Sequence, residues 1–430
     1  MSSPVSWEPP EPGVEAHAAR QGGGAADGLA QRSTLGYLIL LCLAALDAAG
    51  YSVIAPVGPA LAKATGSGPG VVGAVVAAFP IGMLAGFVVG VSAVRRYGSR
   101  TTLLLSLAVV AAGTAGFAVA STVPGFLLAR LVAGIGSGGL WIGVTVGTLE
   151  RWPRQEYVCM SRIYAAYSIG ALIGPGFGAL GGTRRPFLAY LVAVLAGSVL
   201  AAVLPPPRTR RTFHPDRTVL RRPGFRVAAV GIALAVLGTG VADGVLPLHF
   251  ASRLSQAQIA LAYLAVGACV ALGSVLAARL APAVALAAGS ILLTAGIALA
   301  GATDLVPVWL VALAATGIGI GAGQTGSTGV LLDAVPVERI ISAMVVWSQL
   351  GIVGYLVGPA LGGPLAATFG FGALALLPLA GLLVLAAVAV GARRPTRPAR
   401  QLGRAVTKRG PVTRTGAVTR RGAARPGPPR

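Results

Sequence analysis

Residues 167–182 of the chain read YSIGALIGPGFGALGG, and residues 354–363 read GYLVGPALGG. Both stretches share the pattern Gly-x-x-x-Gly-Pro inside an apolar run of the length that crosses a membrane as a helix. A proline within a helix bends its axis, and glycines four residues apart allow a neighbouring helix to approach closely. The pattern predicts two bent, tightly packed membrane helices that serve as a hinge or a seal. The residues of this prediction are Gly170, Gly174, Pro175 and Gly178 in the first stretch and Gly354, Gly358, Pro359 and Gly362 in the second.

The two stretches belong to a longer internal repeat. A shift of the sequence by 183 or 184 residues also superposes Gly134, Gly136 and Gly138 on Gly317, Gly319 and Gly321, and Glu150 on Asp333. The chain is therefore a tandem of two related halves. In a membrane protein such a duplication is typical of a transporter whose binding site lies between the repeats.

The composition indicates a polytopic membrane protein. Hydrophobic residues make up 55% of the 430 residues and charged residues 11%, with a mean hydropathy of +0.79, which excludes an ordinary soluble domain. The three cysteines show no metal or disulfide spacing, and the chain contains no nucleotide loop or nucleophile constellation. We therefore expect no enzyme activity, no cofactor and no metal site. The first 34 residues lack the pattern of a cleaved signal peptide, so we expect the first membrane helix to direct insertion.

The predicted fold is an all-α membrane protein with twelve transmembrane helices in two six-helix pseudo-repeats. The predicted spans are 35–56, 71–94, 101–120, 126–149, 162–182, 187–204, 227–250, 257–278, 283–302, 308–332, 340–363 and 372–391. They form an N-terminal half at 35–204 and a C-terminal half at 227–391. A central loop at 205–226 has seven Arg against one Asp, and residues 1–34 and 392–430 are predicted to be disordered.

The distribution of basic residues predicts the orientation. If the N-terminus is cytoplasmic, the cytoplasmic segments carry 29 Lys and Arg and the opposite loops carry 4. Both termini are therefore expected in the cytoplasm. The expected location of the protein is the plasma membrane. The tail at 392–430 has twelve basic residues and no acidic ones. It is expected either to lie on anionic lipid headgroups or to remain an unconstrained end. It has no aromatic residues to stack on bases, so nucleic acid is not an expected partner.

Few ionisable residues lie within the apolar runs, where a charge is costly unless it faces a cavity or a partner, and three of them stand out. Asp47 lies about 18 Å into the first helix, near the membrane midplane. It is a candidate for carrying a proton or attracting a cationic substrate, or it bonds only to neighbouring helices. Arg130 in the fourth helix is expected to pair with a carboxylate or an anionic substrate, or to extend to the outer surface.

Asp243 lies in the seventh helix, the first of the second half. If Pro56 is matched to Pro247, Asp243 corresponds to Ser52 rather than to Asp47, so the two acids are not copies of one site. Both remain candidates, because the first helix of each half lines the central cavity in duplicated carriers. His249 nearby is expected to be solvated at the outer interface.

Other polar side chains in the apolar segments are candidates for the cavity wall or for contacts between helices. The candidates for the cavity are Trp141, Thr145, Tyr167, Gln324, Trp347 and Gln349, and further polar positions include Tyr164, Ser327, Ser348 and Tyr355.

These residues resemble the major facilitator superfamily, and within it the twelve-helix drug:proton antiporters. RLVAGIGSGG from Arg130 looks like the family's helix 4 motif, and GALIGPGFGALGG from Gly170 looks like the helix 5 signature of the antiporters. The resemblance implies a role for Arg130 in proton coupling. LDAAGYSVIAPVGPAL from Leu46 resembles helix 1 of amine-type exporters, which implies that Asp47 meets a cationic amine or the proton.

One family motif departs from its usual form. The loop between helices 2 and 3 is usually Gly-x-x-x-Asp-Arg-x-Gly-Arg-Lys, whereas residues 90–100 read GVSAVRRYGSR, with Arg95 in place of the Asp. The clamp that this Asp makes between the halves is therefore not expected. The candidate inter-half loop residues are Arg95, Arg96, Gly98 and Arg100, and gating is expected to be looser or to use Arg96, Arg100 and Glu150.

The functional hypothesis is a monomeric, proton-coupled exporter of small amphipathic or cationic organic molecules, in which the halves rock about a central site. An alternative is a proton symporter or facilitator that takes up a sugar or metabolite, for which a denser ring of polar side chains is expected. A non-transporting membrane sensor or scaffold leaves the intramembrane charges unexplained.

Overall fold

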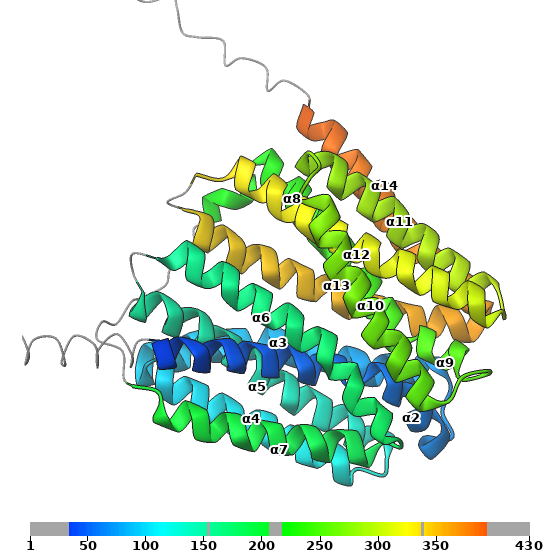
Figure 1. Cartoon of the computed structure of the whole chain (residues 1–430), viewed down its shortest axis with the longest axis horizontal. Coiled ribbons are helices and arrows are strands. Elements are labelled where there is room, and N and C mark those ends of the chain that lie inside the picture. Colours follow the sequence, from blue (N-terminus) through cyan, green and yellow to red (C-terminus); the bar gives the residue numbers. More distant parts are fainter. Residues whose placement is uncertain (1–33, 153–154, 206–216, 337–338, 394–430) are drawn as a thin grey trace, which may run out of the picture. The chain divides into compact units, whose positions relative to one another are not determined.

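A computed structural model describes residues 34–152, 155–205, 217–336 and 339–393 (Figure 1). Within these ranges twelve helices are long and apolar enough to cross a membrane, which confirms the predicted all-α class and the number of spans. Residues 1–33 and 394–430 of the segments predicted to be disordered, and residues 206–216 of the basic loop, lie outside the described residues, whereas residues 34, 392 and 393 are helical.

The first six spans form the N-terminal half. The first span contains a helix at 34–52, followed by the 3-10 turn η1 (Ala55–Val57) and α2 (Gly58–Thr65). The remaining elements are α3 (Pro69–Tyr97), α4 (Ser99–Val119), α5 (Val123–Arg151), α6 (Glu156–Phe177), η2 (Gly178–Leu180) and α7 (Arg184–Val203).

The second six spans repeat this order after the turn η3 (Arg217–Arg221). The elements are α8 (Pro223–Gly244), α9 (Leu246–Phe250), α10 (Gln256–Ala277), α11 (Pro282–Ala302), α12 (Val306–Ala334), α13 (Ile340–Phe369), η5 (Phe371–Ala375) and α14 (Leu376–Arg393). The predicted span 340–363 was too short, because α13 continues through Pro359 and Pro364 to Phe369. Proline is tolerated in membrane helices where neighbouring helices pack against the bend.

Prolines interrupt the first helix of each half at corresponding places. The helix at 34–52 gives way to η1 and α2 around Pro56, and α8 gives way to α9 at Val245, two residues before Pro247. The missing N–H and fixed backbone angle of proline end the regular helix at these points. The correspondence supports the sequence match of Pro56 with Pro247.

Glycines on the fourth helix of each half make equivalent contacts. A Cβ at Gly134 or Gly138 would overlap backbone carbonyls of α3, and one at Gly317 or Gly321 would overlap backbone carbonyls of α10. The intervening glycine of each series faces α4 or α11 in the same way. The duplicated glycines thus clear the backbone surfaces along which three helices of each half meet.

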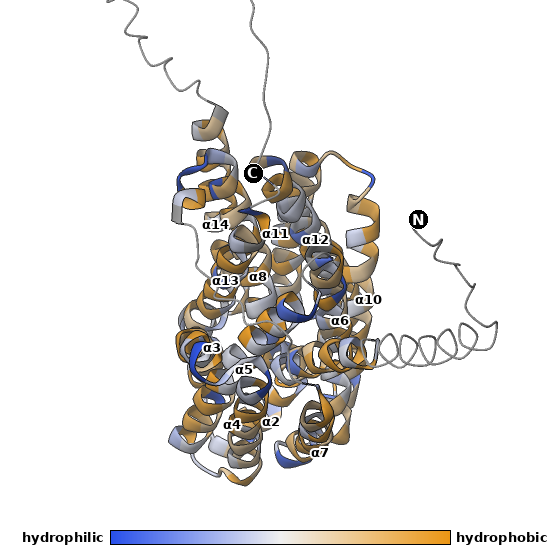
Figure 2. Cartoon of the chain, turned by 90° about the vertical axis from the view of Figure 1, so that its left-hand side faces the viewer, coloured by the Kyte–Doolittle hydropathy of each residue, from blue (hydrophilic) through white to orange (hydrophobic). Residues whose placement is uncertain are grey.

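The contacts between the halves include two pairs of long helices. Figure 2 shows α3 beside α13 on one flank and α6 beside α10 on the other, and these helices are in contact. Apolar side chains such as Val88, Val192 and Leu383 are exposed on the outer helix surfaces, as expected for contact with lipid.

The halves meet closely at the end of the bundle that carries η1, η2 and α9, which we call the sealed end. There Gly73 of α3 packs against the carbonyl of Pro359 and the Cα of Gly363 on α13. On the other flank the Gln256 side chain accepts a hydrogen bond from the Gly182 N–H at 2.8 Å and donates one to the Gly182 carbonyl at 3.0 Å. Both flanks of this end are thereby closed.

Candidate functional site

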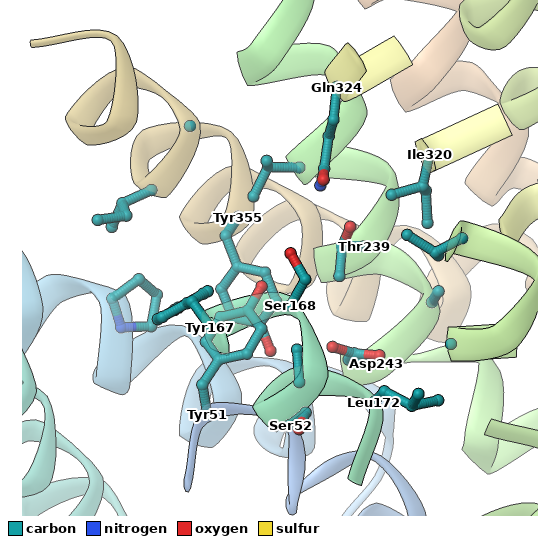
Figure 3. A pocket seen from close by; sticks show the side chains of 18 of the residues that line it. Tyr51, Ser52, Tyr167, Ser168, Leu172, Thr239, Asp243, Ile320, Gln324 and Tyr355 are labelled. Atoms are coloured by element: carbon teal, nitrogen blue, oxygen red, sulfur yellow. The ribbon is translucent and has the colours of Figure 1, made fainter. Parts of the chain in front are cut away.

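A cavity of about 250 Å³ lies between the two halves (Figure 3). Its wall is formed by the helix at 34–52, α3, α5 and α6 of the first half and by α8, α10, α12 and α13 of the second. The duplication therefore places a shared cavity at the interface of the repeats, as the sequence predicted for a carrier.

The cavity wall consists mainly of aromatic and aliphatic residues and carries one acidic side chain among the described lining residues. Asp243 is the single Asp, Glu, Lys, Arg or His among the described residues that line this cavity. Its side chain lies on the last turn of α8 and the residue is 8% exposed. The aromatic lining residues are Tyr51, Phe79, Trp141, Tyr164, Tyr167, Tyr263, Trp347 and Tyr355. A carboxylate among aromatic faces attracts a cation through both charge and ring quadrupoles.

One group of polar side chains, including Asp243, lies toward the sealed end. Figure 3 shows Asp243, Tyr51, Ser52 and Tyr355 around one part of the cavity, which we call the deep pole, with Gln324 farther away. Along α8 the lining extends from Ile232 to Asp243, a rise of about 16 Å. The cavity therefore has a charged end and a longer aromatic and aliphatic body.

Most hydroxyl groups near Asp243 already donate to backbone. Ser52 Oγ and Thr239 Oγ1 each donate to a carbonyl of their own helix at 3.2 and 3.3 Å, and Tyr263 Oη donates to the carbonyl of Ala242. The hydroxyl of Tyr355 is buried and makes no hydrogen bond of standard geometry, although it lies close enough to the Asp243 carboxylate and the Tyr51 hydroxyl to interact with both. Its ring centroid lies 4.2 Å from that of Tyr51.

Trp347 is fixed at the other end of the cavity by a chain of hydrogen bonds. Its Nε1 donates to Ser327 Oγ at 2.8 Å, and Ser327 Oγ donates to the Ala228 carbonyl at 2.7 Å. The chain links α13, α12 and α8, and Ser327 is fully buried. Sequence reasoning had named both side chains without this connection, because their contact depends on the packing of three helices.

Asp47 and Arg130 do not line the central cavity. They lie in a second cavity of about 10 Å³ inside the N-terminal half, together with Ser137 and Tyr190. Phe79 borders both cavities and separates them. Of the two acids considered as candidates on helices that line the central cavity, only Asp243 reaches that cavity in this structure.

The surroundings of Arg130 include neither the expected carboxylate partner nor the expected route to the surface. The residue is 1% exposed, so it does not extend to the surface. Its Nη1 donates to the Gly50 carbonyl at 3.4 Å, and its guanidinium lies 4.4 Å from the centre of the Phe79 ring. Within the described part of the chain Arg130 and Asp47 form no ion pair, and Asp47 Oδ2 has no hydrogen-bond partner. The ring face of Phe79 takes the place of the expected carboxylate.

Of the six residues named for the cavity wall, the central cavity is lined by Trp141, Tyr167, Gln324 and Trp347. Thr145 lies instead in a cavity of about 20 Å³ with Arg95. Gln349 is not among the lining residues, because two positions from Trp347 correspond to about 200° around a helix. Sequence reasoning missed Thr239, although it lies one turn before Asp243 on the same helix face.

The glycines named for the hinge or seal pack within each half, whereas Pro359 and Gly363 of the second stretch also meet α3 of the other half. A Cβ at Gly170, Gly174 or Gly178 would overlap atoms of the first span, from the carbonyl of Ala45 to the side chain of Pro56. On α13, Gly354 and Gly358 face carbonyls of α8 in the same way, and Gly362 approaches the side chain of Val245. Pro175 lines the central cavity two residues before α6 ends. The role of these residues as a hinge remains a prediction.

The arginines near the loop between the second and third spans make contacts inside the N-terminal half. Arg100 donates to the carbonyl of Ala202, and Ser99 Oγ donates to Glu150 Oε2 at 2.6 Å. Arg96 lies 5.4 Å from the centre of the Tyr97 ring. Gly98 has a φ of 84°, which favours glycine where α3 turns into α4. The hydrogen bonds of Arg100 and Ser99 thus hold one half together instead of linking the two.

His249 is not a solvated interface residue as expected. Its side chain is 11% exposed, and its ring stacks on Phe371 with centroids 4.6 Å apart. The Nε2 atom hydrogen-bonds with the Thr303 carbonyl at 3.0 Å and lies 3.7 Å from Asp304 Oδ1. The break after α8 turns this side chain onto the loop between α11 and α12.

Comparison with known proteins agrees with this architecture. A solved structure titled as a bacterial homolog of the human lysosomal transporter Spinster, inward-facing and unoccupied, matches with a TM-score of 0.65 and 15% identity, over 84% of this chain and 95% of that one. The human organic anion transporter MFSD10 (TETRAN) matches with a TM-score of 0.57 and 17% identity, over 82% of this chain and 99% of that one. At these identities the likeness concerns the fold alone.

Sequence comparison identifies the family. The bovine major facilitator superfamily domain-containing protein 10 is 34% identical over 136 residues, which span 31% of this chain and 28% of the bovine protein. The family model described as "Major Facilitator Superfamily" matches residues 40–280 and, in a second match, residues 228–425. These matches extend through both halves, so the chain is a membrane transporter of the major facilitator superfamily and not an enzyme.

Proposed function

We propose that this transporter exports small amphipathic organic cations in exchange for protons. The observation that carries this proposal is Asp243, the one charged side chain that the described residues contribute to an otherwise aromatic and aliphatic central cavity. Such a wall suits a ligand with a flat apolar body and one positive charge. The drug:proton antiporter resemblance of the glycine-rich helix supports the same class.

Proton exchange follows if Asp243 binds either a proton or the cation. Burial makes the charged form of a carboxylate unfavourable, and a cation beside the group offsets this cost. Binding of a proton neutralises the group and removes the attraction for the cation. Because only one of the two can be bound, movement of protons in one direction drives the cation in the other.

The orientation of the proposal rests on the positive-inside distribution of Lys and Arg. With the termini in the cytoplasm, the sealed end faces the outside, and the cavity is in the state that loads a cytoplasmic substrate. We place the protein in the plasma membrane as a monomer, with the basic tail on anionic lipid headgroups.

Transport of an organic anion is the second candidate. Arg130 supports it, because this cation lies directly behind Phe79, one ring away from the cavity. Human MFSD10, which shares the fold, is named as an organic anion transporter. For this function the Phe79 ring would have to move aside and Asp243 would have to be neutral. Uptake of a sugar has less support, since the wall offers few free polar groups.

The test uses purified full-length protein in liposomes with an acidic lumen. The probe is ethidium, whose permanent charge prevents the accumulation that a weak base shows without any carrier. We expect wild type to accumulate the dye. The rate of accumulation by Asp243→Asn should be at least about tenfold lower, because a charge-assisted contact with the dye is removed.

The matched control is Asp304→Asn, which makes the same chemical change at a side chain that is 73% exposed and outside the cavity. This control should transport ethidium like wild type. Accumulation by Asp243→Asn at the wild-type rate would contradict the proposal. Movement of carboxyfluorescein in place of ethidium would favour the organic-anion alternative.

A further inference from the structure

We infer that the deep pole is selective for protonated amines, because it binds N–H donors of an ammonium group between the Asp243 carboxylate and the Tyr355 hydroxyl. This inference rests on the proposed cation transport and names the chemical class of the cation: primary and secondary ammonium groups, in preference to quaternary ones. Tyr355 is the residue that makes the distinction.

The assignment of Tyr355 follows from the hydrogen bonds of its neighbours. Ser52, Thr239 and Tyr263 each use their hydroxyl proton on a backbone carbonyl, so each is held in place by the protein itself. The Tyr355 hydroxyl makes no such bond, although the residue is completely buried. A buried hydroxyl without a well-formed hydrogen bond costs free energy that a ligand can recover by bonding to it.

The position of Tyr355 fits a group that acts together with Asp243. Both residues line the central cavity, and Figure 3 shows them at the same part of it. The 4.2 Å contact with the Tyr51 ring supports the Tyr355 ring from one side. The hydroxyl is covered by its neighbours, so its contact with a ligand forms only when an ammonium enters beside Asp243.

The number of N–H groups on a cation decides how many hydrogen bonds it can donate to Asp243 and Tyr355 at the deep pole. A primary ammonium offers three donors, so it can donate to the carboxylate and to the phenolic oxygen at once. A trimethylammonium has the same charge but no donor. It would leave the Tyr355 oxygen unpaired and hold the carboxylate at a greater distance. Sites built to hydrogen-bond a ligand discriminate against analogues that lack the donor.

The remainder of the cavity accommodates an aromatic body. From Asp243 the wall continues for about 16 Å along α8 to Ile232, with Trp141 and Trp347 among the rings that line it. Trp347 is held by Ser327, so this part of the wall is rigid. An aromatic amine with its nitrogen at the deep pole would place its rings between these side chains.

The experiment measures equilibrium binding to full-length protein in lipid nanodiscs. Two fluorescent probes are compared, a dansyl group on a pentylammonium arm and the same molecule with the arm nitrogen trimethylated. We expect wild type to bind the primary amine about tenfold more tightly, the difference that one hydrogen bond to a charged group makes. Tyr355→Phe should lose most of this preference, through weaker binding of the primary amine alone, and keep only the part that the Asp243 carboxylate contributes.

Two further variants separate this inference from the proposed function. Tyr97→Phe removes a hydroxyl from a half-exposed tyrosine outside the cavity and should keep the wild-type preference. Asp243→Asn should lower the affinity for both probes. If Asp243→Asn lowers it for both while Tyr355→Phe keeps the full preference for the primary amine, that result would contradict the role assigned to Tyr355 and leave the proposed cation binding in place. If wild type binds neither probe, both proposals fail.

Discussion

At the scale of single residues, the two buried acids have different surroundings. Asp243 lines the cavity between the halves, whereas Asp47 lies inside the N-terminal half beside Arg130 and Ser137. The difference follows from helix geometry. Ser52, the residue that corresponds to Asp243, lines the cavity, and Asp47 precedes it by five residues, or about 140° around the helix. Asp47 therefore has no direct access to a ligand in the central cavity.

This separation predicts a split between binding and coupling for Asp47→Asn. The affinity for the dansyl pentylammonium probe should stay within about twofold of wild type, because surface or distant substitutions have small effects at a site they do not touch. The rate of ethidium accumulation driven by the pH gradient should fall, since asparagine cannot carry the second proton that we expect Asp47 to move in addition to the one exchanged at Asp243. Both quantities are measured on the same preparation.

The control for this variant is Ser137→Ala, which removes a neighbouring polar group but no titratable one. It should retain gradient-driven accumulation. A loss of probe binding in Asp47→Asn would show that Asp47 contacts the substrate, as its resemblance to helix 1 of amine exporters implied. The division of roles between the two acids would then be wrong.

At the scale of helices, glycine spacing determines which surfaces come into contact. Along α6, Gly170 and Gly174 face backbone atoms of the first span, so the two helices approach at backbone distance. Gly176 lies on another face of α6, where a Cβ would meet only the Leu264 side chain at 3.7 Å. Gly174 and Gly176 are only two residues apart, but they lie on different faces of α6 and therefore have different neighbours.

This contrast predicts opposite responses to the same substitution. Gly174→Ala should lower the free energy of unfolding by about 1–3 kcal/mol, because the added methyl overlaps Ser52 and the Ala49 carbonyl. Gly176→Ala should be neutral or stabilise by up to about 1 kcal/mol, since alanine favours the helix over glycine. Thermal unfolding of the purified proteins, followed by tryptophan fluorescence, measures both. Equal unfolding temperatures for the two variants would exclude the close-packing interpretation of the motif.

At the scale of the whole molecule, the sealed end is closed by contacts that alternating access has to break. Gln256 of the C-terminal half forms two hydrogen bonds with the backbone of Gly182 in the N-terminal half. Gly181 and Gly182 have φ values of 76° and 71°, a conformation that presents this backbone to the glutamine and favours glycine at both positions. One side chain therefore latches the flank formed by α6 and α10.

The latch predicts a change in the conformational equilibrium for Gln256→Ala. Loss of two hydrogen bonds should shift the balance toward opening of the sealed end by about 1–2 kcal/mol, or roughly five- to thirtyfold. Gln256→Glu should act in the same direction, because a carboxylate accepts from the Gly182 N–H but cannot donate to its carbonyl.

The measurement is the distance between spin labels at Leu180→Cys and Ala251→Cys, two exposed positions near the sealed end, in a background without the native cysteines. A longer-distance population should increase in both Gln256 variants. A control at Gln258, whose side chain caps its own helix with Ser255, should leave the distribution unchanged. An unaltered distribution in Gln256→Ala would mean that the α3–α13 flank alone keeps this end closed.

The sequence by itself determined the architecture of this protein. Twelve apolar runs predicted twelve spans, because a helix in lipid has to satisfy its backbone internally and cover itself with apolar side chains. The shifted glycine series predicted two halves, since glycine positions record where helix backbones touch. The match of Asp243 with Ser52 also contained the information that the two acids are not equivalent.

Only the tertiary structure decided how the candidate residues are grouped. Asp47, Arg130 and Asp243 all lie in apolar runs, but which of them faces the central cavity depends on the rotation of each helix about its axis. That rotation is set by packing against several helices at once, and a linear sequence does not specify it. The same reason explains why the Phe79 partition, the buried Tyr355 hydroxyl and the Gln256 latch became visible only when the halves were assembled.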